Sequence, residues 1–367
     1  MNDAPTPLEA EIRRRIIAAG PMPVSEYMAL CLSHPQHGYY TTTDPLGQRG
    51  DFITAPEVSQ MFGELIGLWM ASVWQQMGAP EHVRIIELGP GRGTLLKDAL
   101  RASAIVPGFR DAVVIHLVEI DPLLKAQQER NLEPFANVTY WHPTLNDVPS
   151  GPGIIIANEF FDALPVHQVV KTEYGWHQRQ VDIDADGKLA FTLALAPIRH
   201  FEWLLSESVR RAPLNSIFEW RSEIAAMDIG RRVARDGGAA LVIDYGHDES
   251  AVGDTLQAVG RHAFADPLTT PGSIDLTAHV DFQSLARAVE AMGAKAHGPI
   301  QQSVFLQRLG IEARAGTLKS NASRAQRADI DAALERLIGT GNSGMGALFK
   351  AMAFALPALG TPPGFET

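Results

Sequence analysis

Three glycines at alternate positions follow an apolar run that contains an acid. The run is Val83–Leu88 with Glu87 inside it, and Gly89, Gly91 and Gly93 come directly after. Glycine lets a backbone turn sharply and approach a ligand closely, and a helical pattern begins after the last of the three. A buried strand, a glycine turn and a helix in this order are typical of a loop that binds a nucleotide cofactor.

The spacing of glycines and acids decides between two such cofactors. A dinucleotide fingerprint requires glycine three places after Gly91, where this chain has Thr94. The next strand-end acid, Glu119, lies about 30 residues after Gly89, whereas NAD-binding folds place theirs at about 20. The pattern instead resembles class I methyltransferases, which use S-adenosyl-L-methionine. There, the acid and glycines of the first loop contact the cofactor, Glu119 holds both ribose hydroxyls, and its neighbour Ile120 is a further candidate for binding the cofactor. A glycine turn needed only for packing is the alternative.

A second set of polar residues follows the fourth predicted strand. It comprises Asn158, Glu159 and Asp162, and doubly wound folds bind ligands beyond the carboxyl ends of their strands. N-methyltransferases often have Asn or Asp followed by Pro-Pro and an aromatic residue here, and this chain has Glu159 in place of the first proline. Carboxylates suit a guanidinium acceptor, because its lone pair is delocalised and its pKa exceeds about 12. We therefore expect these three residues at the site of methyl transfer, where Asn158 should also contact the cofactor, with a turn or capping role as the alternative for Asp162.

The predicted elements place both sets at one edge of a sheet. Apolar strands alternate with helical stretches, which predicts a doubly wound, mostly parallel α/β sheet, with strands at 83–88, 113–120, 138–141 and 153–158. After Pro165 the period changes to two, which predicts an antiparallel insertion at 166–172, 176–183 and 188–195. Later elements are a helix at 222–235, a strand at 239–245, a helix at 280–292, strands near 294–306 and helices over 322–356.

These elements divide the chain into three predicted parts. Residues 1–80 form a helical segment, with a loop from Ser33 to Glu57 that could fold over the ligand. Residues 81–310 form the cofactor-binding core, with the insertion at about 166–220. Residues 311–367 form a C-terminal helical extension.

Composition restricts the class of protein. The 367 residues are 46% hydrophobic and carry no apolar stretch of membrane-spanning length, which suits a globular enzyme without membrane insertion. The N-terminus lacks the features of a secretory signal or an organelle presequence, so we expect a cytoplasmic location in a bacterium. A net charge of −11 opposes nucleic acid as a partner. Cys31 is the single cysteine and should be buried, and His34 and His37 lack a third ligand, so no metal site is expected.

Several segments together resemble the MidA family of mitochondrial and bacterial proteins, which contains a complex I assembly factor similar in role to a protein arginine methyltransferase. The matching segments are 38–40, 50–57, 87–93, 158–165 and 275–282. The resemblance implies a class I methyltransferase with a Rossmann-like sheet of seven strands, and symmetric dimethylation of an arginine in a complex I subunit, as in eukaryotic members.

Two further residues are candidates for the site. By analogy with adenine-N6 methyltransferases, Thr54 contacts the cofactor, with a turn before a helix as the alternative. His279 precedes a predicted helix and is a candidate for binding substrate or transferring a proton. The alternative is a role in capping the helix and packing.

Three functions stay open at this stage. The first is methyl transfer to an arginine of a partner protein. The second is methyl transfer to a small-molecule or nucleobase amine. The third is a protein that binds S-adenosyl-L-methionine and assists assembly without catalysis. The oligomeric state is also open, with a homodimer among the alternatives.

Overall fold

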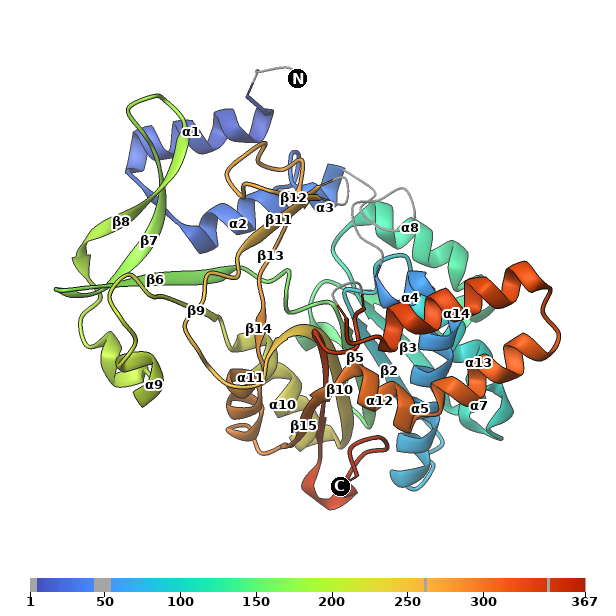
Figure 1. Ribbon diagram of the computed structural model, residues 1–367. Coiled ribbons are helices and arrows are strands. Elements are labelled where there is room, and N and C mark those ends of the chain that lie inside the picture. Colours follow the sequence, from blue (N-terminus) through green and yellow to red (C-terminus); the bar gives the residue numbers. More distant parts are fainter. Residues whose placement is uncertain (1–4, 43–53, 261–262, 342–343, 367) are drawn as a thin grey trace. The chain divides into compact units, whose positions relative to one another are not determined.

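The computed structural model describes residues 5–42, 54–260, 263–341 and 344–366 (Figure 1). The chain folds as two compact units, each built from separated segments. One unit takes Ile53–Phe161, Glu223–Asp248 and Phe282–Thr367, and we call it the sheet unit. The other takes the N-terminal residues up to Phe52 together with Asp162–Ser222 and Glu249–Asp281, and we call it the insertion unit.

A mostly parallel sheet forms the centre of the sheet unit, as predicted. Its strands run in the order β15-β16-β10-β5-β2-β3-β4. Neighbours from β10 to β4 are parallel, and β16 is antiparallel to both β10 and β15. The strands are β2 (Val83–Leu88), β3 (Val113–Val118), β4 (Thr139–His142), β5 (Gly153–Asn158), β10 (Gly238–His247), β15 (Lys295–Gln301) and β16 (Phe349–Ala355).

The central strands are apolar because helices flank the sheet. Along β5 every residue from Gly153 to Ala157 is buried, as expected for a parallel strand covered on both faces. The helices of this unit are α4 (Ala55–Val58), α5 (Gln60–Gln76), α6 (Thr94–Ala102), α7 (Phe109–Ala112), α8 (Pro122–Asn131), α10 (Ile224–Asp236), α11 (Phe282–Glu290), α12 (Gln302–Arg308), α13 (Ile311–Ser320) and α14 (Arg324–Ile338). Short 3-10 turns lie at 103–105, 133–138, 145–147 and 357–359.

Helix α6 is held close to α5 by a glycine. A Cβ added to Gly67 would lie 2.2 Å from the carbonyl oxygen of Ala99, so only glycine allows this approach of the two backbones. Since α6 begins directly after the glycine turn, this contact also fixes the position of the loop that precedes the helix.

Two expectations about the C-terminal half were wrong. The stretch 322–356 is not helical throughout, because Phe349–Ala355 is the strand β16 inside the main sheet. The strands expected over 294–306 end at Gln301, where α12 begins. The helix expected over 280–292 is confirmed as α11 (Phe282–Glu290), which follows the two-residue strand β14 (Val280–Asp281).

The insertion unit contains the predicted antiparallel strands. Its larger sheet runs β1-β7-β6-β9, with β8 paired to β7, and a small sheet runs β12-β11-β13. The strands are β1 (Met22–Pro23), β6 (Val166–Thr172), β7 (Gly175–Ile183), β8 (Leu189–Pro197), β9 (Ile217–Arg221), β11 (Gln257–Gly260), β12 (Ala263–Ala265) and β13 (Asp275–Thr277). Its helices are α1 (Pro7–Ala19), α2 (Val24–Ser33), α3 (Tyr39–Thr42) and α9 (Glu207–Arg210), with a 3-10 turn at 201–204.

The N-terminal helices share one hydrophobic core with these strands. Ile12 and Met28 pack in the same buried cluster as Val166, Val181 and Leu276. The first helices therefore belong with the insertion, whereas α4 and α5, which the sequence grouped with them, pack in the core of the sheet unit.

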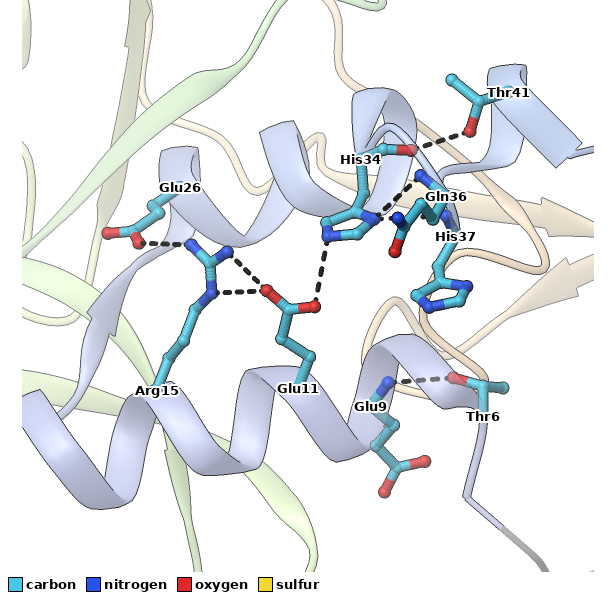
Figure 2. A network of polar contacts seen from close by, with 9 residues as sticks. All are labelled: Thr6, Glu9, Glu11, Arg15, Glu26, His34, Gln36, His37 and Thr41. Carbon is cyan, nitrogen blue, oxygen red and sulfur yellow. Dashed lines mark hydrogen bonds and ion pairs between the residues drawn. The ribbon is translucent and has the colours of Figure 1, made fainter.

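Polar contacts join α1 to α2 and to the turn after it (Figure 2). Arg15 lies between Glu11 and Glu26, and Glu11 Oε2 lies 3.2 Å from His34 Nε2. The backbone amides of Gln36 and the next residue donate to His34 Nδ1. Both ring nitrogens of His34 are thus engaged in contacts between α1, α2 and the turn after α2.

Two further expectations can be compared with the described residues. None of the helices among them is long and apolar enough to cross a membrane. Cys31 is buried, and burial raises the pKa of its thiol to about 12, so it is an inert core residue as expected. Residues 43–53, in the middle of the loop expected to cover the ligand, lie outside the described part of the chain.

Candidate functional site

The strand order of the main sheet reverses between β2 and β5. These strands are parallel neighbours, and the chain leaves them in opposite directions, towards β3 and towards β10. Ligands of doubly wound folds bind at such a switch point, beyond the carboxyl ends of the strands. The glycine turn follows β2, and Asn158 ends β5 with Glu159 directly after it, so the fold brings the glycine turn and these two polar residues to this edge.

The glycine turn adopts a backbone that few other residues tolerate. Gly89, Gly91 and Gly93 have φ values of 59°, 53° and 77°, in the left-handed region. A Cβ at Gly89 would lie 3.1 Å from the ring of Phe160. The turn therefore presents backbone groups without side chains, and the loop after β5 packs against it.

Glu87 is buried immediately before this turn. It is only 3% exposed, and its Oε2 has no hydrogen-bond partner among the described residues. Burial raises the pKa of this carboxyl to about 8, because the charged form loses its hydration. This oxygen is free to accept a hydrogen bond from a bound donor, as far as the described residues show.

Glu119 follows β3 and is held in one orientation. Its Oε1 accepts from the backbone amides of Ile120 and Asp121, each at 2.9 Å, and its Oε2 accepts from Gln128 Nε2 at 3.1 Å. Burial raises the pKa of this carboxyl, and these hydrogen bonds oppose the shift. The Ile120 side chain is 72% exposed, so its apolar surface is open to a ligand.

Gln128 was missed in the sequence. It lies in α8, is fully buried, and its Nε2 also donates to the carbonyl of Gly91 at 2.7 Å. A glutamine inside a mostly polar helix gives no signal of its own, so only the structure shows that it touches the site.

Asn158 and Glu159 are joined to each other and to α4. Glu159 Oε1 accepts from Asn158 Nδ2 and from the backbone amide of Ala55, each at 3.1 Å. Asn158 Oδ1 has no hydrogen-bond partner among the described residues. Glu159 has φ of 49°, a left-handed conformation that is uncommon for a residue with a side chain. Strained backbone of this kind is frequent at functional sites.

Thr54 lies directly before α4 as its N-cap residue. A turn before a helix was the alternative to cofactor contact in the sequence analysis, and the structure has such a turn here. The carbonyl of Thr54 accepts from the amides of Glu57 and Val58, and Pro56 lies in the first turn. Its hydroxyl makes no capping hydrogen bond. Glu57 extends from the same turn to the start of α6, where its Oε1 accepts from the hydroxyl of Thr94 at 2.6 Å.

Asp162 and His279 belong to the insertion unit. Asp162 is 6% exposed, and its carbonyl accepts from the amide of Ala278 at 3.3 Å. Arg221 donates to the carbonyls of both Asp162 and His279, at 3.3 and 2.6 Å, and also to those of Leu164 and Ala278. The structure thus joins the backbones of these two predicted residues through Arg221, which the sequence did not reveal.

Comparison with known proteins decides the family. Residues 65–300 match the model of the family Methyltransf_28, described as S-adenosyl-L-methionine-dependent methyltransferases. The chain belongs to this family. The family is an enzyme family, so this protein is a class I methyltransferase whose methyl donor is S-adenosyl-L-methionine, as the glycine turn and the strand-end acids predicted.

Relatives and solved structures agree with this membership. The chain is 38% identical to the protein arginine methyltransferase NDUFAF7 homolog of Drosophila melanogaster mitochondria, over 94% of this chain and 84% of that protein. It is also 38% identical to the Homo sapiens mitochondrial protein arginine methyltransferase NDUFAF7, over 86% and 76%. A Burkholderia thailandensis crystal structure with bound S-adenosyl-homocysteine superimposes with a TM-score of 0.83 at 29% identity, covering 99% of this chain and 96% of that one.

The residues at the sheet edge fit the methyl donor. The donor carries a sulfonium, an amino group and a ribose diol, and Glu87 offers it an unpartnered buried acceptor. Glu119 offers an oriented carboxylate of the kind that accepts hydrogen bonds from two hydroxyls. Glu87, the three glycines and Glu119 with Ile120 are the residues that would hold the donor, and binding measurements can test this, whereas a contact from Thr54 stays a prediction. The described residues contain no cluster of three or more potential metal ligands.

Proposed function

We propose that this methyltransferase acts on the guanidinium nitrogen of an arginine in a partner protein, a subunit of respiratory complex I, and adds methyl groups symmetrically. The relatives named protein arginine methyltransferases support the class of acceptor. The observation that carries the proposal is the charge of Glu159, which stands at the end of β5, where ligands of this fold bind.

A neutral amine and a guanidinium make opposite demands on this position. A neutral amine already offers a lone pair and gains little from a neighbouring carboxylate. A guanidinium is always charged, and a carboxylate that binds it concentrates positive charge on some nitrogens and leaves one more nucleophilic. Glu159 supplies this charge, and it is held by two donors before any substrate arrives.

The other groups on the chain orient the acceptor. Asn158 Oδ1, which has no partner among the described residues, can accept from a guanidinium N–H. Asp162 is a second candidate carboxylate because of its place in the chain, three residues after Glu159. S-adenosyl-L-methionine, when bound, would supply the methyl group and leave as S-adenosyl-L-homocysteine, and the Glu159 carboxylate would accept the proton that the methylated nitrogen loses. Positioning is the main contribution that the protein makes to such an in-line displacement.

Methylation of purified complex I substrates tests this proposal. Complex I subunits from a strain lacking this protein would be incubated with the purified chain and S-adenosyl-L-methionine carrying a labelled methyl group. We expect label in one subunit, and fragmentation should place symmetric dimethylarginine at one residue. Label in RNA, DNA or a small amine instead would assign a different acceptor.

A role in assembly without catalysis predicts a different result. In that case the deletion strain would lose assembled complex I, yet the same subunits from the wild-type strain would contain no methylated arginine. Mass spectrometry of complex I subunits from both strains separates this outcome from the proposed one.

A further inference from the structure

We propose that Gln128 is a positioning residue for the cofactor, acting through the ribose-binding carboxylate of Glu119 and the carbonyl of Gly91. The inference rests on the assignment of Glu119 to the ribose, and it does not depend on which acceptor is methylated. It is carried by the hydrogen bonds of one fully buried amide.

The orientation of this amide is determined by its partners. Trp141 Nε1 donates to Gln128 Oε1 at 2.8 Å, and an indole nitrogen can only donate. The oxygen of Gln128 must therefore face Trp141, and its Nε2 must face Gly91 O at 2.7 Å and Glu119 Oε2 at 3.1 Å. Both hydrogens of the amide group are used, and the side chain has no alternative arrangement in this setting.

Gln128 connects the glycine turn and the acid after β3, which belong to the candidate cofactor site, with strand β4. Gly91 lies in the turn after β2, Glu119 follows β3, and Trp141 lies in β4, while Gln128 itself lies in α8. The nearest atoms to a Cβ placed on Gly93 also belong to Gln128, at 3.6 Å. A change at this residue thus shifts the glycine turn relative to the acid that follows β3, and the donor must contact both.

The amide also favours the charged state of Glu119. Burial disfavours that charge, whereas Gln128 and the amides of Ile120 and Asp121 donate to the carboxylate and favour it. An ionised carboxylate accepts hydrogen bonds from two hydroxyls, which is the pattern that a ribose diol requires. Loss of Gln128 should therefore weaken cofactor binding by misplacing Glu119 and by favouring its protonated form.

A double-mutant cycle on the binding of S-adenosyl-L-homocysteine tests this role. Calorimetry would compare the full-length wild type, Gln128→Met, Glu119→Gln and the double variant, with Gln127→Met as the control on the same helix. We expect Gln128→Met to raise Kd by about 10-fold, the size of one or two lost charge-assisted hydrogen bonds. In the Glu119→Gln background the same change should raise Kd by less than about threefold, because the two residues act together. The control should bind like the wild type.

Other outcomes overturn the inference. Wild-type affinity in Gln128→Met, or equal losses in both backgrounds, would show that Gln128 does not act through Glu119. Wild-type affinity in Glu119→Gln would show that Glu119 does not bind the ribose. The proposed acceptor would still be tested separately by the labelled-methyl assay on complex I subunits. If Gln128→Met does not fold, Gln128→Glu retains the acceptor for Trp141 and places a second carboxylate beside Glu119. Its affinity should fall as pH rises from about 5 to 8, and a flat profile would contradict the proposed contact.

Discussion

Glu159 Oε1 accepts a hydrogen bond from the backbone amide of Ala55 at 3.1 Å, which ties the acid after β5 to the first turn of α4. Asn158 Nδ2 donates to the same oxygen. A glutamine at position 159 retains an oxygen that can accept both bonds and loses only the charge. The position thus allows charge and geometry to be tested separately.

Glu159→Gln should abolish methyl transfer while retaining cofactor binding. We expect kcat to fall by at least about 100-fold, the range for removal of an electrostatic group that acts in the transition state. The Kd for S-adenosyl-L-homocysteine should stay within about twofold, because the hydrogen bonds to Ala55 and Asn158 are retained. A labelled-methyl assay and calorimetry measure the two quantities. Near-normal kcat in this variant would remove Glu159 from the mechanism.

Glycine and alanine at position 159 should differ in stability. The residue has φ of 49°, which costs a side chain about 1 kcal/mol and costs glycine almost nothing. Both substitutions remove the same hydrogen bonds, so their difference isolates the backbone. Glu159→Gly should unfold at a higher denaturant concentration than Glu159→Ala, by about 1 kcal/mol in free energy. Equal stability of the two variants would argue against a strained backbone here.

Local patterns allowed the elements around the candidate cofactor site to be predicted. Glu87 lies within β2, the glycine turn follows β2 and Glu119 follows β3, and the strand–turn–helix order is visible within a short window of sequence. The observed turn and sheet follow that prediction. Gln128 and Arg221 could not be predicted, because their partners are mostly backbone carbonyls and side chains that only the tertiary fold brings near.

Strand β16 shows a second limit of sequence patterns. Almost every residue of Phe349–Ala355 is buried, so the strand has no alternation of polar and apolar residues. A short apolar run of this kind cannot be distinguished from a buried helix by its period, and it follows a long helical stretch. The grouping of the N-terminal helices with the insertion could not be predicted either. It depends on buried contacts between residues that are far apart in the sequence.

Glu87→Gln should stabilise the protein in the absence of ligand. The pKa of this carboxyl is raised to about 8 in the folded state from an ordinary value of 4.5. Its contribution to stability is therefore fully present below about pH 4.5 and is lost as pH rises to about 8. At pH 7.5 we expect the uncharged variant to gain on the order of 3 kcal/mol relative to the wild type.

Thermal unfolding from pH 5 to 8 measures this effect. The stability of the wild type should decline more steeply across the range than that of Glu87→Gln. The variant should also bind S-adenosyl-L-methionine about 10-fold more weakly, since it lacks the carboxylate that pairs with a cationic ligand. Parallel pH profiles for the two proteins would contradict the raised pKa.

Gly89→Ala should weaken cofactor binding more than a matched glycine substitution. A Cβ here meets the ring of Phe160 at 3.1 Å, and φ is 59°, so both the turn and the loop after β5 must shift. We expect a rise of at least about 10-fold in Kd for S-adenosyl-L-homocysteine, with a loss of about 1–2 kcal/mol in stability. The control is Gly78→Ala, which has φ of 85° and nothing within 4 Å of the added carbon. Gly78→Ala should lose stability because of its backbone conformation alone and should bind S-adenosyl-L-homocysteine like the wild type. Equal affinity of the two variants for this ligand would show that the glycine turn does not contact the cofactor.

Arg221→Met should impair methyl transfer without affecting cofactor binding. The guanidinium donates to carbonyls at Asp162, Leu164, Ala278 and His279, and so connects the two segments that carry the predicted acid and histidine. Methionine has similar reach and no donors, which leaves these carbonyls without their partner. The glycine turn and Glu119 lie in the other unit, so the loss should fall on the acceptor step. We expect kcat to drop by about 10-fold or more, as is usual when positioning in an active site is disturbed.

Arg211→Met is the matched control for this variant, because Arg211 is exposed and lies directly after α9, where it pairs with Glu207 at the start of that helix. It should retain wild-type kcat and wild-type Kd for S-adenosyl-L-homocysteine. Circular dichroism would first establish that Arg221→Met is folded at the assay temperature. Given a folded protein, wild-type kcat would show that the segments around Asp162 and His279 do not serve the reaction. An increase in Kd equal to the fall in kcat would instead assign Arg221 to the fold as a whole, because a local effect on the acceptor leaves donor binding intact.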